Sequence, residues 1–391
     1  MKCVSALSTE SDTESAWADV AGRVADGLSG QPADLAVVFI SADHAGALET
    51  IGRDVRARGI ARHVIGCTAE SVVGEGREVE GSSALSLWAV SLPGVELATK
   101  RLTFDDGQLH GLSAEGTPAD RPETLLVLGD PFTFPAEDVL KRLNETAPGL
   151  KIVGGMASAS HVPRGNRLLV DDAVFQDGAV ACSLTGPVAL RTVVSQGCRP
   201  IGRPLVVTRA ERNVIRELGG KPALEVLREI FDGLTPDDQE RVRQGLHIGR
   251  VISEYQDAFR QGDFLIRNVL GTDDAGGIAV SDLIRAGRTV QFHVRDADSA
   301  DEDLRGLLET ERLARPTARV HGALLFSCNG RGTRLFPGPN HDVEALHRAF
   351  GAVPVAGFFA MGELGPVGGQ NFVHGYTASI VLFEEAEGAT A

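Results

Sequence analysis

The chain has 391 residues, 43% of them hydrophobic, and a formal net charge of −15. A chain of this length forms more than one hydrophobic core, so we expect two α/β domains. The negative charge argues against nucleic acid or an anionic membrane surface as the main partner, because either would repel the protein.

No apolar run reaches the roughly 20 residues that a membrane-spanning helix needs. The N-terminus becomes polar and acidic after a short apolar stretch. The 5 cysteines are scattered and include no C-x-x-C pair, a pattern typical of reduced thiols in a cytosol. We therefore expect a cytoplasmic protein that has no membrane partner and no structural metal site.

The first predicted element is a helix close to the N-terminus. Ser11 and Glu14 have the spacing of a capping box, and four apolar residues then recur on one helical face. The apolar residues are Trp17, Val20, Val24 and Leu28.

A β-α-β unit follows, and the pattern occurs three times in the chain. Apolar strands at residues 35–40, 125–128 and 323–326 each precede a helix and then a second strand, which contains Gly66, Gly154 or Gly357. A short segment of small or polar residues and a further strand complete each copy. In α/β proteins ligands bind beyond the carboxyl ends of parallel strands. We therefore expect the ligand site at the loops that follow these glycines.

The region between the second and third copies differs. It predicts a helix over 221–232 and a strand in which Val290, Phe292 and Val294 alternate with polar residues, His293 among them. We expect the side chain of His293 to be solvated. Gly219 and Gly220 interrupt the preceding pattern, so we predict domains at 30–220 and 221–385. The predicted fold is α/β, with two domains, repeated β-α-β units, mixed sheets and an inserted hairpin and helix region in the C-terminal half.

The third copy carries the candidate ligand site. Residues 326–336 place a thiol, an amide and a guanidinium at the end of a buried strand, where glycines allow a ligand to approach the backbone. The backbone N–H groups, with Arg331 and Arg334, would suit a carboxylate or phosphate. The alternative is a glycine turn with a buried cysteine and surface arginines. If this turn is a ligand site, replacing Arg331 by alanine should abolish ligand binding. The stability of the ligand-free protein should stay nearly unchanged.

The loop over 357–379 supplies apolar walls and a few polar groups, as small-molecule pockets do, although its aromatic residues could equally pack only in a core. A carboxylate at Glu363 needs a partner such as Arg331, or else a shifted pKa. The predicted ligand-binding residues are Cys328, Asn329, Gly330, Arg331, Gly332, Phe358, Glu363, Asn371 and His374.

Two other functions stay open on the residues alone. Cys328 with His341 or His374 could act as nucleophile and base, but no third orienting residue is evident, so we assign no catalytic residue and favour a protein that is not an enzyme. A haem sensor is the second alternative, and its candidate axial ligands are His44, His63 and His161. We assign no metal ligand.

Several of these segments resemble a known family. The runs 328–332, 357–359, 362–369 and 371–375 are similar to the C-terminal signature of FIST (F-box and intracellular signal transduction) proteins, and residues 288–303 also resemble that domain. Residues 64–67 and 152–155 resemble the FIST N-terminal domain.

The resemblance implies a bacterial-type sensory protein that binds a small ligand, such as an amino acid or another anionic metabolite. It also implies that haem is a possible cofactor, since some family members bind haem and sense nitric oxide. No output domain is evident in the sequence, so a separate signalling protein would have to read the state of this one.

Overall fold

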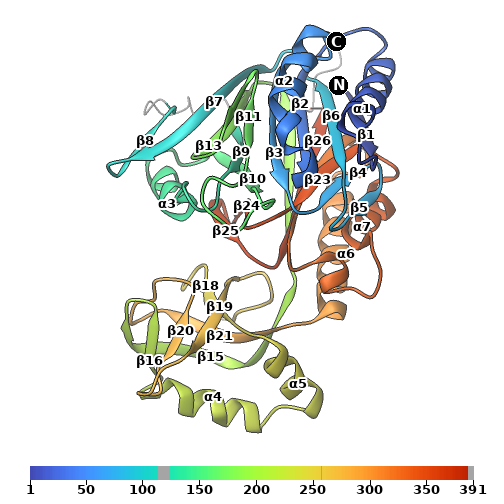
Figure 1. The fold of residues 1–391 in the computed structure, drawn as a ribbon. Helices are drawn as coiled ribbons and strands as arrows, with labels where there is room; N and C mark the ends of the chain where they lie inside the picture. Colours follow the sequence, from blue (N-terminus) through green and yellow to red (C-terminus); the bar gives the residue numbers. More distant parts are fainter. Residues whose placement is uncertain (113–122, 257, 386–391) are drawn as a thin grey trace. The chain divides into compact units, whose positions relative to one another are not determined.

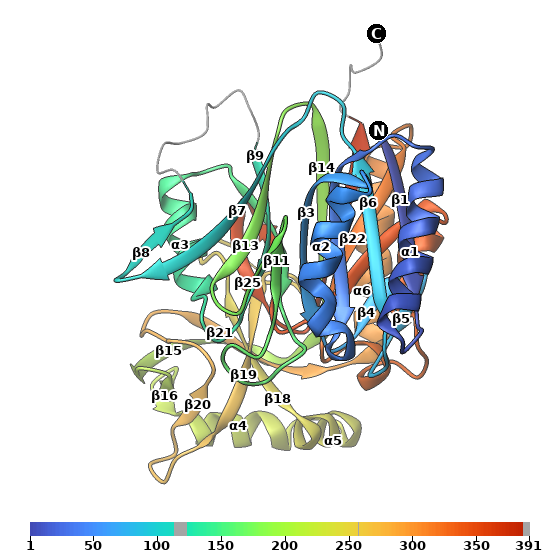
Figure 2. The same cartoon turned by 45° about the horizontal axis from the view of Figure 1, so that its top comes forward.

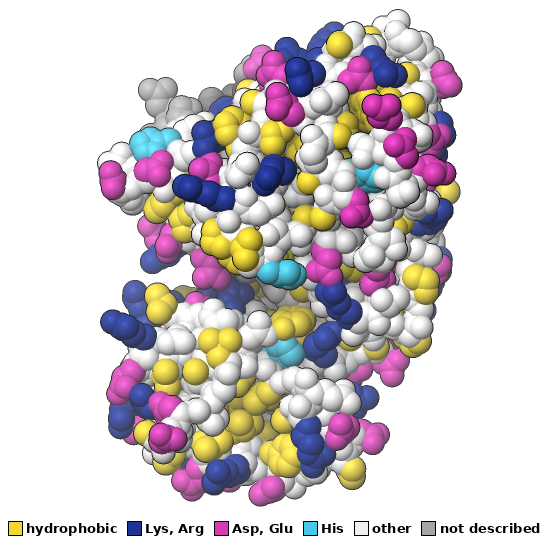
Figure 3. All heavy atoms as spheres, in the orientation of Figure 1, with side chains coloured by type: hydrophobic (Ala, Val, Ile, Leu, Met, Phe, Trp, Pro, Cys, Tyr) yellow, Lys and Arg dark blue, Asp and Glu magenta, His cyan; other side chains and the backbone are white. Residues whose placement is uncertain are grey.

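The computed structural model describes residues 1–112, 123–256 and 258–385 (Figures 1 and 2). The chain forms two compact units. The larger unit comprises Met1–Val194 and Arg305–Ala391, and the smaller unit comprises Ser195–Leu304. None of the helices in the described residues is long and apolar enough to cross a membrane. On the face drawn in Figure 3, acidic and basic side chains are interspersed.

The larger unit consists of three copies of one motif, as the sequence predicts. Each copy has two parallel strands joined through a helix, then a hairpin, then a strand antiparallel to the first. The first copy contains β2 (Ala33–Ser41), η1 (Ala42–Ala47), α2 (Leu48–Ala57), β3 (Ala61–Ala69), β4 (Val72–Gly74), β5 (Arg77–Val79) and β6 (Leu85–Ser91). The second contains β9 (Glu123–Gly129), α3 (Ala136–Thr146), β10 (Lys151–Met156), β11 (Leu168–Val170), β12 (Ala173–Phe175) and β13 (Ala179–Thr185). The third contains β22 (Val320–Cys328), η2 (Gly332–Arg334), α7 (His341–Phe350), β23 (Val355–Ala360), β24 (Glu363–Val367), β25 (Gln370–His374) and β26 (Thr377–Glu385).

Each hairpin leaves its own copy and extends the sheet of another copy. The hairpin β4–β5 of the first copy pairs with β23 of the third. The hairpin β24–β25 of the third pairs with β10 of the second, and β11–β12 of the second pairs with β3 of the first. The exchange is cyclic, so no sheet is complete without a strand pair from another copy. Four further strands extend the opposite edges of these sheets: β1 (Lys2–Ser8), β7 (Glu96–Asp105), β8 (Gln108–His110) and β14 (Val188–Gln196).

The three glycines that mark the repeat in the sequence occupy one equivalent position in the fold. Gly66, Gly154 and Gly357 each lie in the second strand of their copy, opposite a residue of the first strand. A Cβ atom added to them would lie 2.4, 1.9 and 1.8 Å from the carbonyl oxygens of Val38, Val127 and Leu325, respectively. In all three copies, therefore, the two strands approach each other so closely at this position that no side chain fits there.

A single core joins the three copies. Phe39 of the first copy and Phe326 and Phe358 of the third lie with their ring centroids 5.0 to 6.2 Å apart, and apolar residues of the second copy pack in the same cluster. A second layer of core lies under α1 (Thr13–Leu28), which buries Trp17, Val20, Val24 and Leu28 as predicted. Its N-cap is Asp12, which accepts the N–H of Ser15. The predicted cap at Ser11 is wrong by one residue.

The smaller unit is an antiparallel sheet that closes on itself, because β15 pairs with both β21 and β16. The order of the strands is β15-β21-β18-β19-β20-β16-β17. Gly219 and Gly220 lie between β16 and β17, inside this unit. The strands are β15 (Cys198–Glu211), β16 (Val214–Leu218), β17 (Lys221–Pro222), β18 (Leu246–Val251), β19 (Phe264–Thr272), β20 (Ile278–Val280) and β21 (Thr289–Arg295). The helices are α4 (Ala223–Asp232) and α5 (Pro236–Gln244), and α6 (Ala297–Ala314) continues from this unit into the sequence of the larger one.

One prediction for this unit is wrong. Val290, Phe292 and Val294 alternate into its core as expected, but His293 is fully buried instead of solvated. Its ring lies 4.9 Å from that of Phe264 and its Nδ1 lies 3.0 Å from the carbonyl oxygen of Gln291. Burial lowers the pKa of His293 to about 4. Alternation in the sequence identifies two faces of a strand but does not show that both faces are covered.

Candidate functional site

The candidate site begins where β22 ends. Cys328 is the last residue of β22, and Arg331 donates its N–H to the carbonyl of Cys328 at 2.8 Å, which closes a tight turn. Gly332 continues the turn with a φ of 58°, and a Cβ there would lie 2.7 Å from the carboxylate of Glu80. The turn therefore needs glycine at position 332, both for the backbone angle and for the space.

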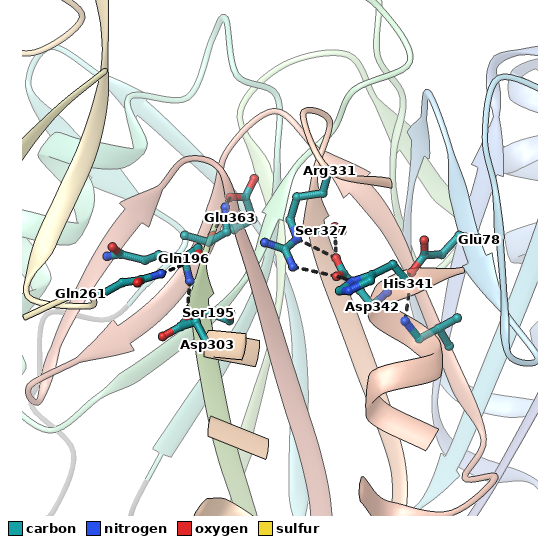
Figure 4. Close-up of polar contacts among 12 residues, drawn as sticks. Glu78, Ser195, Gln196, Gln261, Asp303, Ser327, Arg331, His341, Asp342 and Glu363 are labelled. Carbon is teal, nitrogen blue, oxygen red and sulfur yellow. Dashed lines mark hydrogen bonds and ion pairs between the residues drawn. The ribbon is translucent and has the colours of Figure 1, made fainter. Parts of the chain in front are cut away.

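Arg331 points into the protein and not toward solvent. Its side chain is fully buried, and it donates hydrogen bonds from Nε and Nη2 to the two carboxylate oxygens of Asp342 at 2.8 and 2.7 Å (Figure 4). Ser327 donates to the same carboxylate at 2.7 Å. Although burial works in the opposite direction, the charge and the hydrogen bonds of Arg331 hold the pKa of Asp342 well below its usual range. The two-point geometry is typical of strong arginine–carboxylate pairs.

The predicted ion pair between Arg331 and Glu363 does not form, because the Arg331 guanidinium pairs with Asp342 instead. Oε2 of Glu363 accepts hydrogen bonds from the N–H and the hydroxyl of Thr377 at 3.2 and 2.7 Å. Glu363 is fully buried, and burial raises its pKa to about 8 against the smaller lowering effects of Thr377 and Arg331. The alternative expectation, a shifted pKa, therefore describes this carboxyl group.

A glutamate of the first copy completes the cluster. Oε1 of Glu78, in β5, accepts the N–H groups of Asp342 and Val343 at 2.9 Å each, and so caps the N-terminus of α7. The N–H of Glu78 donates in turn to Oδ1 of Asn340 at 2.7 Å. Burial, and then the charge of Asp342, raise the pKa of Glu78 to about 8. The exchanged hairpin thus brings a residue of the N-terminal half into contact with the C-terminal site.

Cys328 lies at the partly exposed rim of this cluster. Its sulfur accepts the N–H of Gly330 at 3.5 Å. Burial, with the nearby charge of Glu363, raises the pKa of the Cys328 thiol to about 12. A thiol with so high a pKa carries almost no thiolate at neutral pH, which works against a nucleophilic role.

Three of the predicted site residues have other structural roles. Phe358 belongs to the aromatic core described above. Asn371 lies toward the far end of the hairpin β24–β25, where its side-chain amide bonds the N–H of Ile152 and the carbonyl of Leu150 at 2.8 Å each. His374 lies opposite Glu363 in that hairpin, and its Nε2 is 3.0 Å from the carbonyl oxygen of Gly365. The cluster around Cys328 therefore brings together Cys328, Asn329, Gly330, Arg331, Gly332 and Glu363.

Several buried polar atoms in this cluster have no hydrogen-bond partner among the described residues. They are Nη1 of Arg331, Oε1 of Glu363, Oε2 of Glu78 and Oδ1 of Asn329. Such atoms are rare in folded proteins and each costs stability unless a ligand or water satisfies it. Their neighbours Cys328, Asn329 and Gly330 are only partly buried. The turn at the end of β22 thus combines unsatisfied groups with a partly exposed rim.

The sequence did not reveal the residues that organise this cluster. Asp342 lies in the first turn of α7, and its carboxylate binds Arg331. Glu78 gives no signal in the sequence, because 264 residues separate it from Asp342. His341 lies beside Asp342, with Nδ1 2.9 Å from Oδ1, and its ring stacks on Phe336.

Two of the histidines considered as haem ligands lie at opposite ends of one sheet. His44 follows the carboxyl end of β2, and its Nδ1 lies 2.8 Å from the hydroxyl of Thr13. His63 lies near the start of β3, which runs parallel to β2, and so lies at the opposite end of that sheet. His161 is exposed in the loop after β10. Within the described part of the chain, no group of three or more His, Cys, Asp or Glu side chains is placed to hold a metal ion.

Matches to known families and proteins cover nearly the whole chain. Residues 34–221 match the model of the FIST N domain, and residues 223–366 match that of the FIST C domain. The chain is 41% identical over 382 residues to an uncharacterised protein of Mycobacterium tuberculosis, covering 96% of this chain and 98% of the relative. It is 40% identical over 381 residues to an uncharacterised protein of Mycobacterium bovis, covering 96% and 97%.

Proposed function

The chain belongs to the FIST family, whose domains are associated with sensing in signal transduction, and from this premise we propose that it is a sensory protein that binds a small ligand. The ligand binds at the turn after β22, against Arg331, Glu363 and Asn329. We expect the protein to act in the cytoplasm and to pass its signal to a separate signalling protein.

The observation that carries this proposal is the set of unsatisfied buried atoms. Nη1 of Arg331 is a charged donor, Oε1 of Glu363 belongs to a carboxyl group beside the Cys328 thiol, and Oδ1 of Asn329 belongs to the residue that follows Cys328. A ligand carboxylate on Nη1 would form a charge-assisted hydrogen bond. The proposed ligand is therefore an amino acid or another small anionic metabolite.

The hydrogen bonds around Asp342 offer a route for the signal. A ligand that forms a hydrogen bond with Arg331 would also affect Asp342, which is bonded to that guanidinium. Asp342 lies at the start of α7 and donates its N–H to Glu78. Glu78 belongs to the hairpin that the first copy contributes to the sheet of the third. Ligand binding can shift the position of this hairpin only if it favours one arrangement of these bonds over another.

Thermal-shift screening against amino acids, organic acids and nucleotides tests the proposal. Binding to the folded state at about 100 times the dissociation constant stabilises it by about 2.7 kcal/mol. Asn329→Ala removes an unsatisfied oxygen without breaking a hydrogen bond, so it should abolish the shift and leave the ligand-free melting temperature nearly unchanged. Arg348→Ala is the control, because Arg348 lies at an exposed position of α7 and pairs with Glu344. A shift that persists in Asn329→Ala would place the ligand elsewhere.

A further inference from the structure

The connection between the second strand and the hairpin is longer in the second copy of the motif than in the other two. Only residues 70–71 join β3 to β4 in the first copy, and only residues 361–362 join β23 to β24 in the third. In the second copy, residues 157–167 join β10 to β11. We call this segment the 157–167 loop. Since the other two copies are built without such a loop, the motif itself does not require it.

Buried polar groups hold the 157–167 loop in one conformation. The amide of the fully buried Asn166 donates to Oδ1 of Asp130, which is also fully buried, at 2.9 Å. The oxygen of the same amide accepts the N–H of Ser160 at 3.0 Å. A Cβ on Gly165 would lie 1.9 Å from the hydroxyl oxygen of Ser160, so the two sides of the loop touch each other. Nη1 of Arg167 lies within 3.3 Å of three successive carbonyl oxygens of the loop. Compact loops that pack on themselves in this way are frequently functional.

The tip of the loop is exposed, apolar and basic. Every residue over 161–164 is exposed, and Val162 is 60% exposed. Residues 157–170 include no acidic residue, although the formal net charge of the chain is −15. Arg164 forms no ion pair among the residues that the structure describes. Its φ of 62° is a left-handed conformation that glycine adopts at less cost. The fold thus presents an apolar side chain and a free guanidinium on a rigid loop, which lowers the entropy cost of binding a partner.

A series of hydrogen bonds connects the base of the loop to the turn after β22. Ser158, which is buried, accepts the N–H of Glu70 at 3.0 Å and donates to the carbonyl of Phe359. The carboxylate of Glu70 pairs with Arg334, and Arg334 also donates to the carbonyl of Asn329 at 2.9 Å. Asn329 belongs to the proposed ligand site. A ligand that shifts this turn would therefore act on the base of the 157–167 loop.

We infer that the tip of the 157–167 loop is the docking surface for the separate signalling protein, and that this partner presents an apolar pocket bordered by carboxylates. The inference rests on the proposed function and deepens it. Val162 and Pro163 fill the pocket, and Arg164 pairs with the carboxylates at its border. The net negative charge of the chain repels an acidic partner elsewhere, so the acid-free loop selects the orientation in which the partner docks.

Photo-crosslinking in cells that express the native chain provides the first test. The photoreactive residue p-benzoylphenylalanine replaces Val162 in the full chain. In the control it replaces Leu313, an apolar residue of α6 that is 59% exposed. We expect position 162 to cross-link a protein that position 313 does not, and Arg164→Glu to reduce this cross-linking at least about tenfold.

The cross-linked protein is then purified and titrated with the full chain. Arg164→Glu should raise the dissociation constant at least about tenfold by charge reversal, and Val162→Ser should do the same by leaving the pocket unfilled, at least about tenfold. Arg348→Glu, at an exposed position of α7, should bind as the wild type does. Higher ionic strength should weaken the binding of the wild type and hardly affect that of Arg164→Ala.

Three results would overturn the inference. The first is that position 162 cross-links no protein, or only proteins that position 313 also cross-links. The second is cross-linking to nucleic acid or lipid in place of protein. The third is a purified partner that binds Arg164→Glu as tightly as the wild type. The ligand screen uses the purified chain without a partner, so a ligand shift that persists in the loop variants would leave ligand sensing intact.

Discussion

Asn340 accepts a hydrogen bond from the N–H of Glu78 at 2.7 Å although 262 residues separate the two. In turn, the Glu78 carboxyl group caps α7 by accepting the backbone N–H groups of Asp342 and Val343. A helix normally receives its N-cap from the residue that precedes it. Here Asn340 makes no side-chain bond to the helix, and the cap comes from a hairpin of another copy. The start of α7, which carries Asp342, therefore depends on the exchange of hairpins.

Replacing Glu78 by alanine should lower the free energy of unfolding by about 1–2 kcal/mol, because α7 loses its cap. Glu78→Gln keeps an acceptor oxygen in the same position and should cost clearly less. Urea denaturation followed by tryptophan fluorescence measures this in the larger unit, since both tryptophans, Trp17 and Trp88, lie there. Equal losses in the two variants would show that the charge, and not the cap, is what matters.

Arg331→Ala should destabilise the protein by about 3–5 kcal/mol, because it leaves the buried carboxylate of Asp342 without its partner. The sequence by itself led us to expect that this substitution would leave stability nearly unchanged, but the burial of the side chain against Asp342 now favours a large loss. The control Arg334→Ala removes a pair at the surface, where the loss should stay below about 1 kcal/mol. Denaturant midpoints of the two variants decide the matter. Equal midpoints would mean that Arg331 and Asp342 do not form a buried pair in solution.

Gly357→Ala should cost at least about 3 kcal/mol or prevent folding, because the new Cβ would lie 1.8 Å from a backbone oxygen that cannot move without breaking the pairing of β22 and β23. Gly338→Ala provides the comparison, since a Cβ at that position meets no atom within 4 Å, and its effect should stay within about 0.5 kcal/mol. Circular dichroism melts of the two variants test the prediction. Similar melting temperatures would contradict the close approach of the two strands.

The larger unit should lose stability as the pH rises from about 4.5 to about 8. In the folded state the pKa of Glu363 and that of Glu78 are raised from 4.5 to about 8, so over this range the folded state binds more protons than the unfolded state. The free energy of unfolding then falls with increasing pH, and the contribution of these groups is complete only below about 4.5.

Urea denaturation at several pH values between about 5 and 8 measures this fall, again through tryptophan fluorescence. Glu363→Gln should flatten the curve, because the amide does not titrate. Glu344→Gln, at an exposed position of α7, should leave the curve unchanged. A wild-type stability that rises steadily over this range would show that neither carboxyl group is protonated in the folded state.

Cys328 should react slowly with iodoacetamide. With a thiol pKa of about 12, only about one molecule in a hundred thousand carries the thiolate at pH 7, so labelling should be at least about a thousandfold slower than that of a free cysteine derivative. Mass spectrometry after timed labelling identifies the modified residue, and labelling in urea confirms that all 5 cysteines can react. Rapid labelling of Cys328 in the folded protein would revive the hypothesis of a cysteine-nucleophile enzyme.

The sequence by itself determined the repeated motif. The three glycines, the apolar strands before them and the helices between are local patterns, because strand and helix periodicity and the steric demands of glycine act over a few residues. For the same reason the residues of the turn after β22 could be identified as a candidate site from their order along the chain.

Only the tertiary structure decided which groups meet. The exchange of hairpins brings Glu78 to α7 and places Glu363 in a sheet of the second copy, and no local pattern encodes a pairing between strands so far apart. Burial was equally undetermined: the fold encloses the guanidinium of Arg331, and it encloses the ring of His293, which was expected to face solvent. The partner of a charged group and its pKa depend on what surrounds it in three dimensions. The chemistry of this site, an arginine held by Asp342 beside a buried glutamate whose pKa is raised, therefore follows from the fold and not from the order of its residues.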